Sequence, residues 1–369
     1  MRRAGGRVAV RVAVVGYGYW GSKHVRVLSG LPNVAVTVVD EDAERRADAT
    51  RTFDSTPVVP RLDDVVDDVD AVIVATPPST HAPVAQAAVA AGRHVLVEKP
   101  LATAAAECEA LIEAAAAGGL VLMVGHTFEY NPAVAKLREL IETGELGELR
   151  YIDTARLNLG LYQRDVNVIW DLAPHDISII NHILGRSPKA VSAWANRHGN
   201  TVMEDVAYLQ LQYDDPELSA YVHVSWLDPC KVRRVTVVGT EKMAVYNDVS
   251  LNERIRIYDV GVTEDASQET MHTVPVNYRY GDIVSPYIPM EEPLAVQDAH
   301  FIDCVRSGRD PRTDGTSGLD VVRVLEAAGR AVRAGHEVPI DDRPHRSAVS
   351  PVAAGSSNGH RAHRAGAGV

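Results

Sequence analysis

Two short motifs contain the residue types that acid–base chemistry requires. Asp171 and His175 are four residues apart in a helical stretch, so their side chains share one face and Asp171 can orient or polarise the imidazole ring. Lys99 lies between Glu98 and Pro100 at the end of an apolar run, where a charged pair costs desolvation free energy unless it is used or paired. Taken singly, the motifs also fit a hydrogen-bonded core histidine and a surface Glu–Lys turn.

A third motif, the glycine-rich turn at residues 16–21, indicates a dinucleotide site. It follows the apolar run at 8–15 and consists of Gly16, Tyr17, Gly18, Tyr19, Trp20 and Gly21. The first glycine of such a turn permits a tight bend, the second lets the backbone approach a pyrophosphate, and the third allows close packing of helix on strand. S-adenosylmethionine sites and purely structural turns also use glycine in this way, so the motif needs support from elsewhere.

Support comes from the ends of later apolar runs. Asp40 ends the second run and is placed to accept hydrogen bonds from the ribose hydroxyls of NAD. The acids beside it would repel the 2′-phosphate of NADP, although Arg45 and Arg46 leave some room for it. Two polar turns end the runs at 71–75 and 94–97, where open α/β sheets bind ligands. They contribute the cofactor candidates Thr76, Pro77, Pro78, His81, Glu98 and Lys99.

The elements that must position these motifs change character between residues 125 and 148. Up to residue 125, Val-rich runs of strand length alternate with Ala-rich helical stretches, which predicts a parallel sheet covered on both faces. From about residue 148, short strand-like runs separated by turn formers predict a largely antiparallel sheet. We therefore expect an α/β protein: a doubly wound Rossmann sheet, then an α+β domain with a large, open, mostly antiparallel sheet.

The 369 residues are enough for about two domains. We predict a dinucleotide-binding domain at 1–125 and a substrate and oligomerisation domain at 126–342, whose late helices pack back on the first domain. The segment 343–369 is rich in Ser, Gly, Ala, Arg and His without periodicity, and is predicted to be disordered.

Composition excludes several classes of partner. The 49 acidic residues outnumber the 37 Lys and Arg, which leaves a net charge of −12. The chain therefore lacks the positive field that holds a protein on nucleic acid or anionic lipid. No window is long and apolar enough for a membrane span, and the run at 8–15 fits a first strand better than a secretion signal. Three distant cysteines form neither a disulfide framework nor a metal site. We expect a cytoplasmic protein without a bound metal.

Together these motifs resemble the Gfo/Idh/MocA family of nicotinamide-dependent oxidoreductases over about residues 8–335. The matching segments are residues 16–21, 76–78, 98–100, 125–132 and 170–176. The resemblance implies NAD as the cofactor, and Lys99, Asp171 and His175 as the catalytic set. It also implies a C-terminal sheet that forms the interface of a homodimer or homotetramer. Within the family, residues 170–178 and 225–229 are most similar to 3-dehydrogenases of UDP-N-acetylglucosamine or its uronic acid.

From this resemblance we expect hydride transfer between a sugar ring carbon and nicotinamide. His175 would accept the hydroxyl proton, because its unperturbed pKa of about 6.5 lies near working pH. Lys99 would donate a hydrogen bond to the same oxygen and stabilise its developing charge. Asp171 would orient His175 and support its protonated form.

Further side chains near the expected cleft are candidates for substrate contacts. The candidates for binding its phosphates are Lys231, Arg233 and Arg234, or Arg156 and Arg164. Alternate residues on a solvated strand face would give the same pattern. Other candidates are Asn131 and His126, in the loop after the run at 120–124, and Tyr162, as a platform for a sugar ring. Trp194 and Trp226 are expected in the core or at a sheet interface.

Other functions use the same motifs. One is NAD-dependent glycoside cleavage through transient oxidation at C3, and another is oxidation of inositol or a free sugar. A third is a non-catalytic NAD-binding sensor. The set of Lys99, Asp171 and His175 argues against a sensor, because a sensor needs no proton acceptor.

Overall fold

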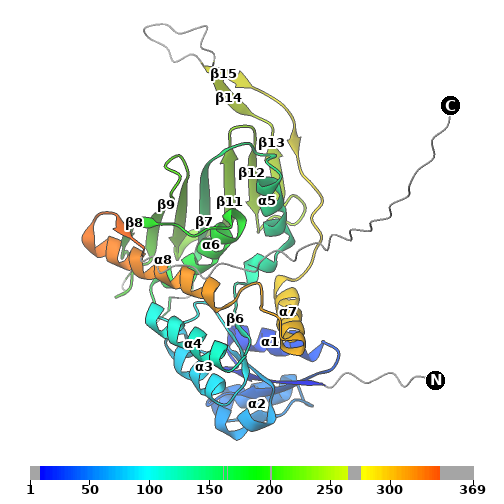
Figure 1. Ribbon diagram of the computed structural model, residues 1–369. Helices are drawn as coiled ribbons and strands as arrows, with labels where there is room; N and C mark the ends of the chain where they lie inside the picture. The colour runs from blue at the N-terminus through cyan, green and yellow to red at the C-terminus, as the bar shows by residue number, and fades with distance from the viewer. Residues whose placement is uncertain (1–8, 161, 164, 200–201, 265–275, 341–369) are drawn as a thin grey trace, which may run out of the picture.

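The computed structural model describes residues 9–160, 162–163, 165–199, 202–264 and 276–340, so the tail predicted at 343–369 lies outside the described residues. The first half of the chain forms a six-stranded parallel sheet in the order β3-β2-β1-β4-β5-β6 (Figure 1). Its strands are β1 (Val10–Val15), β2 (Val34–Val39), β3 (Val58–Val59), β4 (Ala71–Val74), β5 (His94–Val97) and β6 (Leu122–Val124). This is the strand order of a dinucleotide-binding Rossmann sheet, so the fold class predicted for this half is confirmed.

Helices connect and cover these strands. They are α1 (Tyr19–Ser29), α2 (Ala43–Thr52), α3 (His81–Ala90) and α4 (Ala105–Ala117). All four residues of β4 are buried, as are three of the four in β5, because central strands of a parallel sheet are covered on both faces. The Val-rich runs that predicted these strands are thus the core of the sheet.

The second half contains a nine-stranded sheet in the order β16-β13-β12-β11-β7-β10-β9-β8-β17. Neighbouring strands are antiparallel except for β7 and β10, which run parallel, so the predicted mostly antiparallel sheet is confirmed. Its strands are β7 (Leu149–Leu159), β8 (Ala190–Asn196), β9 (Val206–Gln212), β10 (Ser219–Ser225), β11 (Leu227–Gly239), β12 (Met243–Asn247), β13 (Ile255–Tyr258), β16 (Ile283–Val284) and β17 (Val338–Pro339). A hairpin of β14 (Gly261–Glu264) and β15 (Val276–Arg279) extends beyond the sheet (Figure 1).

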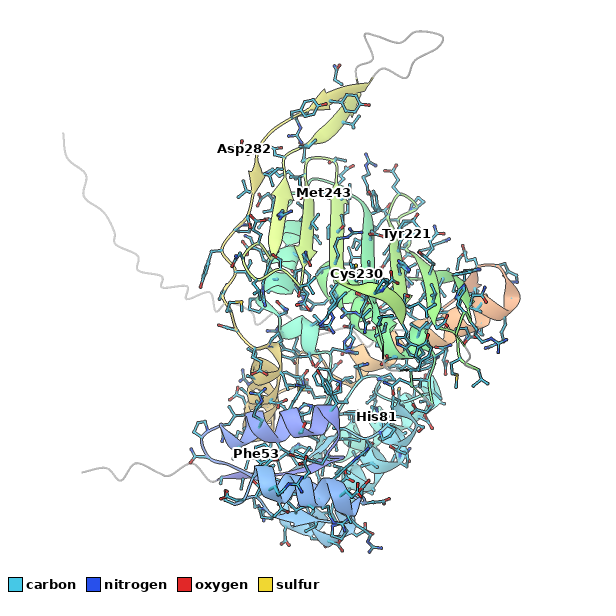
Figure 2. All side chains as sticks on the ribbon, turned by 180° about the vertical axis from the view of Figure 1, so that it is seen from behind. Phe53, His81, Tyr221, Cys230, Met243 and Asp282 are labelled. Atoms are coloured by element: carbon cyan, nitrogen blue, oxygen red, sulfur yellow. The ribbon has the colours of Figure 1, made fainter. Side chains whose placement is uncertain are left out.

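Helices lie on one face of the nine-stranded sheet and leave the other face open. The covering helices are α5 (Pro132–Glu142), α6 (Val168–Leu184) and α8 (Gly315–Ala334) (Figure 1). Figure 2 looks onto the open face, where Tyr221 and Met243 mark two of the strands. Helix α5 was not predicted from the sequence, although Asn131 caps its start and Pro132 fills its first turn, which are recognisable start signals.

The last two helices join the two halves. Helix α7 (Pro293–Ser307) packs on α1, and α8 packs on α4 and β6 as well as on β8. Phe301 and Ile302 of α7 belong to the same buried cluster as Val12 and Val14 of β1. Residues 293–334 therefore complete the core of the Rossmann half. Within the described ranges, no helix is long and apolar enough to cross a bilayer.

Candidate active site

The glycine turn between β1 and α1 has the geometry of a phosphate cradle. Gly16 has φ +94°, and a Cβ there would lie 2.7 Å from the carbonyl oxygen of Ala75. A Cβ on Gly21 would lie 1.7 Å from the Gly16 carbonyl oxygen, whereas one on Gly18 would meet nothing within 4 Å. No side chain caps the start of α1, so its N–H groups and the open space at Gly18 fit the pyrophosphate of a dinucleotide.

Asp40 lies beside this turn at the end of β2. Its carboxylate accepts hydrogen bonds from the backbone N–H of Tyr17 at 2.6 Å and of Asp42 at 2.9 Å. Arg46 donates to the backbone carbonyl oxygens of Asp40 and Glu41. The acidic loop is therefore fixed next to the glycine turn, as the ribose of a bound NAD requires.

The turn after β4 is tied to the turn after β5 by His81. Its Nδ1 lies 2.7 Å from the carbonyl oxygen of Pro100, and its Nε2 lies 2.9 Å from that of Thr76. Each ring nitrogen thus faces a backbone carbonyl oxygen, so His81 joins the two turns that the sequence predicted to hold the cofactor. The hydroxyl of Thr76, next to Pro77 and Pro78, is buried and has no partner among the described atoms, so it is available to a ligand.

Lys99 bridges the two halves of the molecule. Its Nζ donates to the carbonyl oxygen of Asp171 at 2.7 Å and lies 3.4 Å from Asp171 Oδ1. The other carboxylate oxygen, Oδ2, accepts a hydrogen bond from Trp226 Nε1 at 3.0 Å. The end of strand β5 and the helix α6 therefore meet at a lysine–aspartate pair and at a tryptophan, neither of which was predicted as a contact from the sequence.

His175 is buried one turn further along α6. Its Nδ1 has no hydrogen-bond partner among the described atoms, and its ring packs edge-on against Phe128 at 5.2 Å. Burial, followed by the positive charges of Lys99, Arg156 and Arg233, lowers the pKa of His175 well below its usual value. The imidazole is therefore neutral at pH 7 and can accept a proton.

The carboxylate of Asp171, expected from the sequence to orient His175, has other partners in the structure. The carboxylate of Asp171 is engaged by Lys99 and Trp226 instead, although Asp171 and His175 are four residues apart on one helix. Spacing of i and i+4 puts two side chains on one face, but partners from β5 and from the end of β10 compete for the carboxylate.

His126 lies in the same region, at the end of β6. Its side chain is 1% exposed, and neither ring nitrogen has a partner among the described atoms. Burial lowers its pKa and outweighs the negative charges of Glu129 and Glu98, which raise it, while the positive charge of Lys99 lowers it further. A buried polar group without a partner is rare in proteins, so this region holds a neutral imidazole that a ligand can satisfy.

Two predicted substrate residues have structural roles. Arg156 donates to Asp176 at 2.8 and 3.2 Å, its guanidinium lies over the ring of Phe128, and it is 4% exposed. Asn131 accepts from the N–H of Ala133 and donates to the hydroxyl of Tyr246. These contacts correct the expectation that Arg156 and Asn131 meet the substrate.

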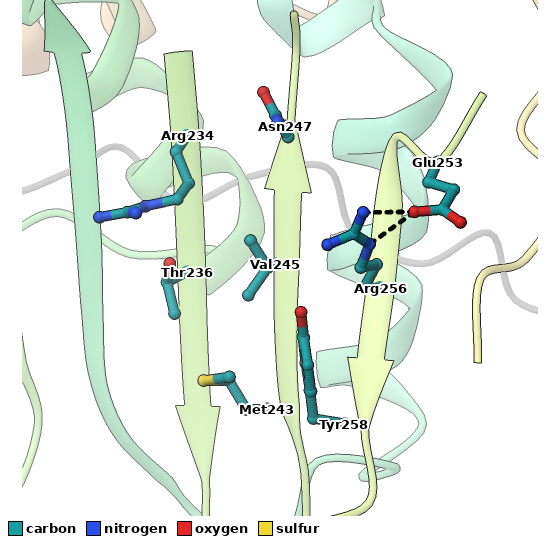
Figure 3. A pocket seen from close by; sticks show the side chains of 8 residues that line it. All are labelled: Arg234, Thr236, Met243, Val245, Asn247, Glu253, Arg256 and Tyr258. Atoms are coloured by element: carbon teal, nitrogen blue, oxygen red, sulfur yellow. Dashed lines mark hydrogen bonds and ion pairs between the residues drawn. The ribbon is translucent and has the colours of Figure 1, made fainter. Parts of the chain in front are cut away.

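The predicted cluster of Lys231, Arg233 and Arg234 is divided by the pleat of β11. Arg233 pairs with Asp248 at 3.4 Å and lies on the face that carries Arg156, its partner on β7. Arg234 lies on the open face, in a depression of about 410 Å³ that Figure 3 shows with Met243 and Arg256. Successive strand residues point to opposite faces, so Arg234 is excluded from the cleft. Lys231 is exposed.

Tyr162 remains near the site. Its ring packs against that of Trp226, 5.1 Å away, and it is 38% exposed. Tyr162 thus contacts Trp226, the residue that donates a hydrogen bond to Asp171. Arg164 lies outside the described residues. No group of three or more His, Cys, Asp or Glu in the described part of the chain is arranged to hold a metal ion.

The fold and the site together define a dinucleotide-dependent oxidoreductase of the Rossmann class. A model of the oxidoreductase family with an NAD-binding Rossmann fold, Gfo/Idh/MocA, matches residues 10–126, and a model of the family's C-terminal domain matches residues 134–245. The chain belongs to the Gfo/Idh/MocA family, as its motifs indicated.

Similar proteins include several sugar and inositol dehydrogenases. The UDP-N-acetylglucosamine 3-dehydrogenase of Acidithiobacillus ferrooxidans is 29% identical over 332 residues, which are 87% of this chain and 96% of that protein. The scyllo-inositol 2-dehydrogenase (NADP⁺) of Bacillus subtilis is 25% identical over 353 residues, 86% of this chain and 92% of that protein. The solved structure of GenD2 from gentamicin A biosynthesis, in complex with NAD, has a TM-score of 0.76 and 28% identity over 91% of this chain and 97% of that one.

Proposed function

We propose that this chain transfers hydride between NAD(H) and a ring carbon of a sugar, namely C3 of a nucleotide sugar. The observation that carries the proposal is the contact of Lys99 Nζ with Asp171, one helical turn from the buried His175. A proton acceptor and an oxyanion donor thereby meet at the edge of the dinucleotide sheet. The similarity to the UDP-N-acetylglucosamine 3-dehydrogenase supports the substrate class.

The roles of the side chains follow from their environments. His175 is neutral because it is buried among cations, so it can accept the proton of the substrate hydroxyl. Lys99 donates to the same oxygen and stabilises its negative charge. Asp171 holds the ammonium of Lys99 in place through two contacts. Bound NAD accepts or supplies the hydride.

We propose NAD as the preferred cofactor. Asp40 lies at the end of β2 with Asp42 beside it, and both would repel a 2′-phosphate. Arg46 donates hydrogen bonds to the backbone carbonyl oxygens of Asp40 and Glu41. Arg45 lies 3.8 Å from the Asp40 carboxylate. Both cations are therefore already engaged by this acidic loop. One relative is named for its use of NADP⁺. The ratio of the kcat/KM values measured with NAD and with NADP therefore tests the cofactor preference directly.

Arg233 and the exposed Lys231 are our candidates for binding the phosphates of the substrate, with Tyr162 as the platform for its sugar ring. Arg233 lies on the same face of the sheet as Arg156, and its positive charge contributes to the lowered pKa of His175, which supports its choice as a candidate. A cytoplasmic location fits the three cysteines, all of which are free.

We also propose that a second copy of the chain covers the open face of the nine-stranded sheet. Tyr151, Trp194, Tyr208 and Tyr221 are 42–50% exposed there. Exposed aromatic side chains on one face are typical of a subunit interface, and a homodimer or homotetramer would bury them.

The test is a spectrophotometric assay at 340 nm with NAD and a panel of UDP-, dTDP- and GDP-sugars, free sugars and inositols. Formation of NADH together with a 3-ketosugar is the expected result with a nucleotide sugar. Turnover of inositol alone would support the second candidate, which the inositol dehydrogenase relatives favour. Cleavage of a glycoside without net NADH, or binding of NAD without any turnover, would contradict the proposal.

A further inference from the structure

Three ionisable side chains from distant parts of the sequence form a buried chain beneath Lys99. Asp298 lies on α7, His24 on α1, and Glu98 at the end of β5. His24 Nδ1 lies 3.0 Å from both carboxylate oxygens of Asp298, and His24 Nε2 lies 3.0 Å from Glu98 Oε1. His24 and Asp298 are 0% exposed, and Glu98 is 4% exposed.

The imidazole of His24 is held in its charged form. Each ring nitrogen faces a carboxylate, and only an imidazolium can donate from both. Burial by itself disfavours the charge, but Asp298 and Glu98 outweigh it and raise the pKa of His24 to about 10. A buried ionic group of this kind adds little stability compared with apolar residues of similar size, so the fold alone does not explain it.

The chain ends on the backbone of the catalytic lysine. Glu98 Oε2 accepts a hydrogen bond from the N–H of Lys99 at 3.2 Å. A Cβ on Gly125 would lie 3.0 Å from Glu98 Oε1 and 3.1 Å from Glu98 Cα, so the exit of β6 packs directly against this carboxylate. The glutamate is therefore fixed on one side by His24 and on the other by the strand next to it.

The other end reaches two further parts of the site. His24 lies one turn beyond Gly21 on the helix whose first turn forms the phosphate cradle. Next to Asp298, Gln297 accepts a hydrogen bond from Thr127 at 2.8 Å, in the segment that follows His126. The three side chains thus connect the helix of the cofactor turn with Lys99, and Gln297, the neighbour of Asp298, connects them to the loop with the unpartnered imidazole.

We propose that Asp298, His24 and Glu98 are positioning residues that fix the backbone of Lys99 relative to the glycine turn. Lys99 Nζ then meets the reacting oxygen at the place where the cofactor presents its ring. This role for Glu98 differs from the expectation that it contacts the cofactor. The proposal rests on the proposed function in one respect, namely the reaction in which Lys99 takes part.

The experiment compares Glu98→Gln, Asp298→Asn and His24→Phe with the wild-type protein. The amide variants keep the shape of the carboxylates, so they report on the proposal even if His24→Phe does not fold. Asp303→Asn is the matched control, because Asp303 lies on the same helix as Asp298 but is exposed and pairs with Arg309. Three quantities are measured for each variant: kcat for the sugar oxidised best, the Kd of NADH by fluorescence, and the melting temperature.

We expect Glu98→Gln to lower kcat about 10- to 100-fold, because a small displacement of a catalytic group has an effect of this size. The Kd of NADH should stay near the wild-type value, whereas the melting temperature should fall, because the buried imidazolium of His24 loses one of its two carboxylates. In a Lys99→Arg background, Glu98→Gln should lower kcat far less, since the lysine it positions is gone. Parallel losses of kcat and NADH binding, or full additivity of the two substitutions in the double variant, would indicate a merely structural role and overturn the proposal.

A second readout needs no substrate. The rate at which acetic anhydride labels Lys99, followed by mass spectrometry of the peptide that contains it, reports whether its ammonium remains at Asp171. Lys99 should be labelled faster in Glu98→Gln and His24→Phe than in wild type or Asp303→Asn. Equal rates in all four proteins would overturn the proposal. If no sugar is turned over, the proposed function fails, while this measurement still decides the role of the chain.

Discussion

Trp226 Nε1 donates a hydrogen bond to Asp171 Oδ2 across 3.0 Å, from a side chain that is 1% exposed. The second oxygen of the same carboxylate lies 3.4 Å from Lys99 Nζ. One aspartate thus connects an indole at the end of β10 with an ammonium at the end of β5. The position of the Lys99 ammonium consequently depends on a residue of the antiparallel sheet.

Replacing Trp226 with Phe should lower kcat about tenfold, because the ring is kept but a hydrogen bond to a charged group is lost. The KM for NAD should change little, since the cofactor turn is not touched. Steady-state kinetics at 340 nm measure both quantities. Trp194→Phe is the matched control: Trp194 is 50% exposed on the open face, so its kcat should equal that of wild type.

Replacing Lys99 with Met should lower kcat at least 10²- to 10³-fold, about the loss that follows removal of an oxyanion donor. Binding of NAD should remain, because the glycine turn and Asp40 are unchanged. Isothermal titration with NAD and a turnover assay separate the two effects. Lys136→Met serves as control, since Lys136 pairs with Glu139, three residues further along α5. Lost NAD binding with full turnover per bound cofactor would contradict the assignment.

The pH dependence of alcohol oxidation should reflect the lowered pKa of His175. An imidazole can act as a base when it is neutral. Burial among cations lowers the pKa of His175 well below its usual value of 6.5, so the ring stays neutral at pH values somewhat below 6.5. We expect kcat/KM for oxidation to stay constant as the pH falls through 6.5 and to decline only at lower pH. A pH–rate profile between pH 5 and 9 checks this. A decline centred at or above 6.5 would show that another group is the base, or that the imidazole is solvated.

Stability should depend on pH through His24. Its folded pKa is about 10, above the unfolded value of 6.5, so its contribution is fully present below pH 6.5 and is lost as the pH rises through 10. The free energy of unfolding should fall by about 3 kcal/mol between pH 6.5 and 9 from this group alone. Urea unfolding of wild type and Asp298→Asn at both pH values measures this change. The free energy of unfolding should fall less between the two pH values in the variant than in wild type. An equal fall in both proteins would contradict the prediction.

The open face of the sheet should respond to charge. Tyr221 is 42% exposed there, and Tyr221→Arg should shift the protein toward monomer, because two copies would bring like charges into an apolar interface. Light scattering after size-exclusion chromatography reports the mass. Arg51→Glu on α2, in the Rossmann half, is the control and should leave the mass unchanged. An unchanged mass for Tyr221→Arg would place the interface elsewhere.

The sequence predicted the features that local patterns determine. The glycine turn, the acid at the end of β2 and the alternation of strands and helices follow from short runs of residues whose conformational demands are independent of the rest of the chain. These predictions needed no knowledge of which side chain meets which.

Roles that depend on distant partners could not be predicted in this way. Arg156 has a side chain that commonly binds phosphate, but in this structure its charge is neutralised by Asp176 within the core. His24 and Asp298 are 274 positions apart, and no local pattern relates them. Arg233 and Arg234 look like one cluster in the sequence, and only the register of β11 shows that they face opposite sides.

The packing of α7 and α8 has a consequence for how the molecule can be cut and recombined. Phe301 and Ile302 fill the core around β1, and Leu319 and Val322 of α8 fill the core around β4 and β5. A fragment that ends after β6 would therefore expose apolar surface and lose its solubility. In chain order, most of the nine-stranded sheet lies between β6 and α7, but α8 and β17 return to it. A chimera that exchanges residues 126–292 should therefore keep α7, and it must match its new sheet to the α8 side chains that pack on β8 and α6.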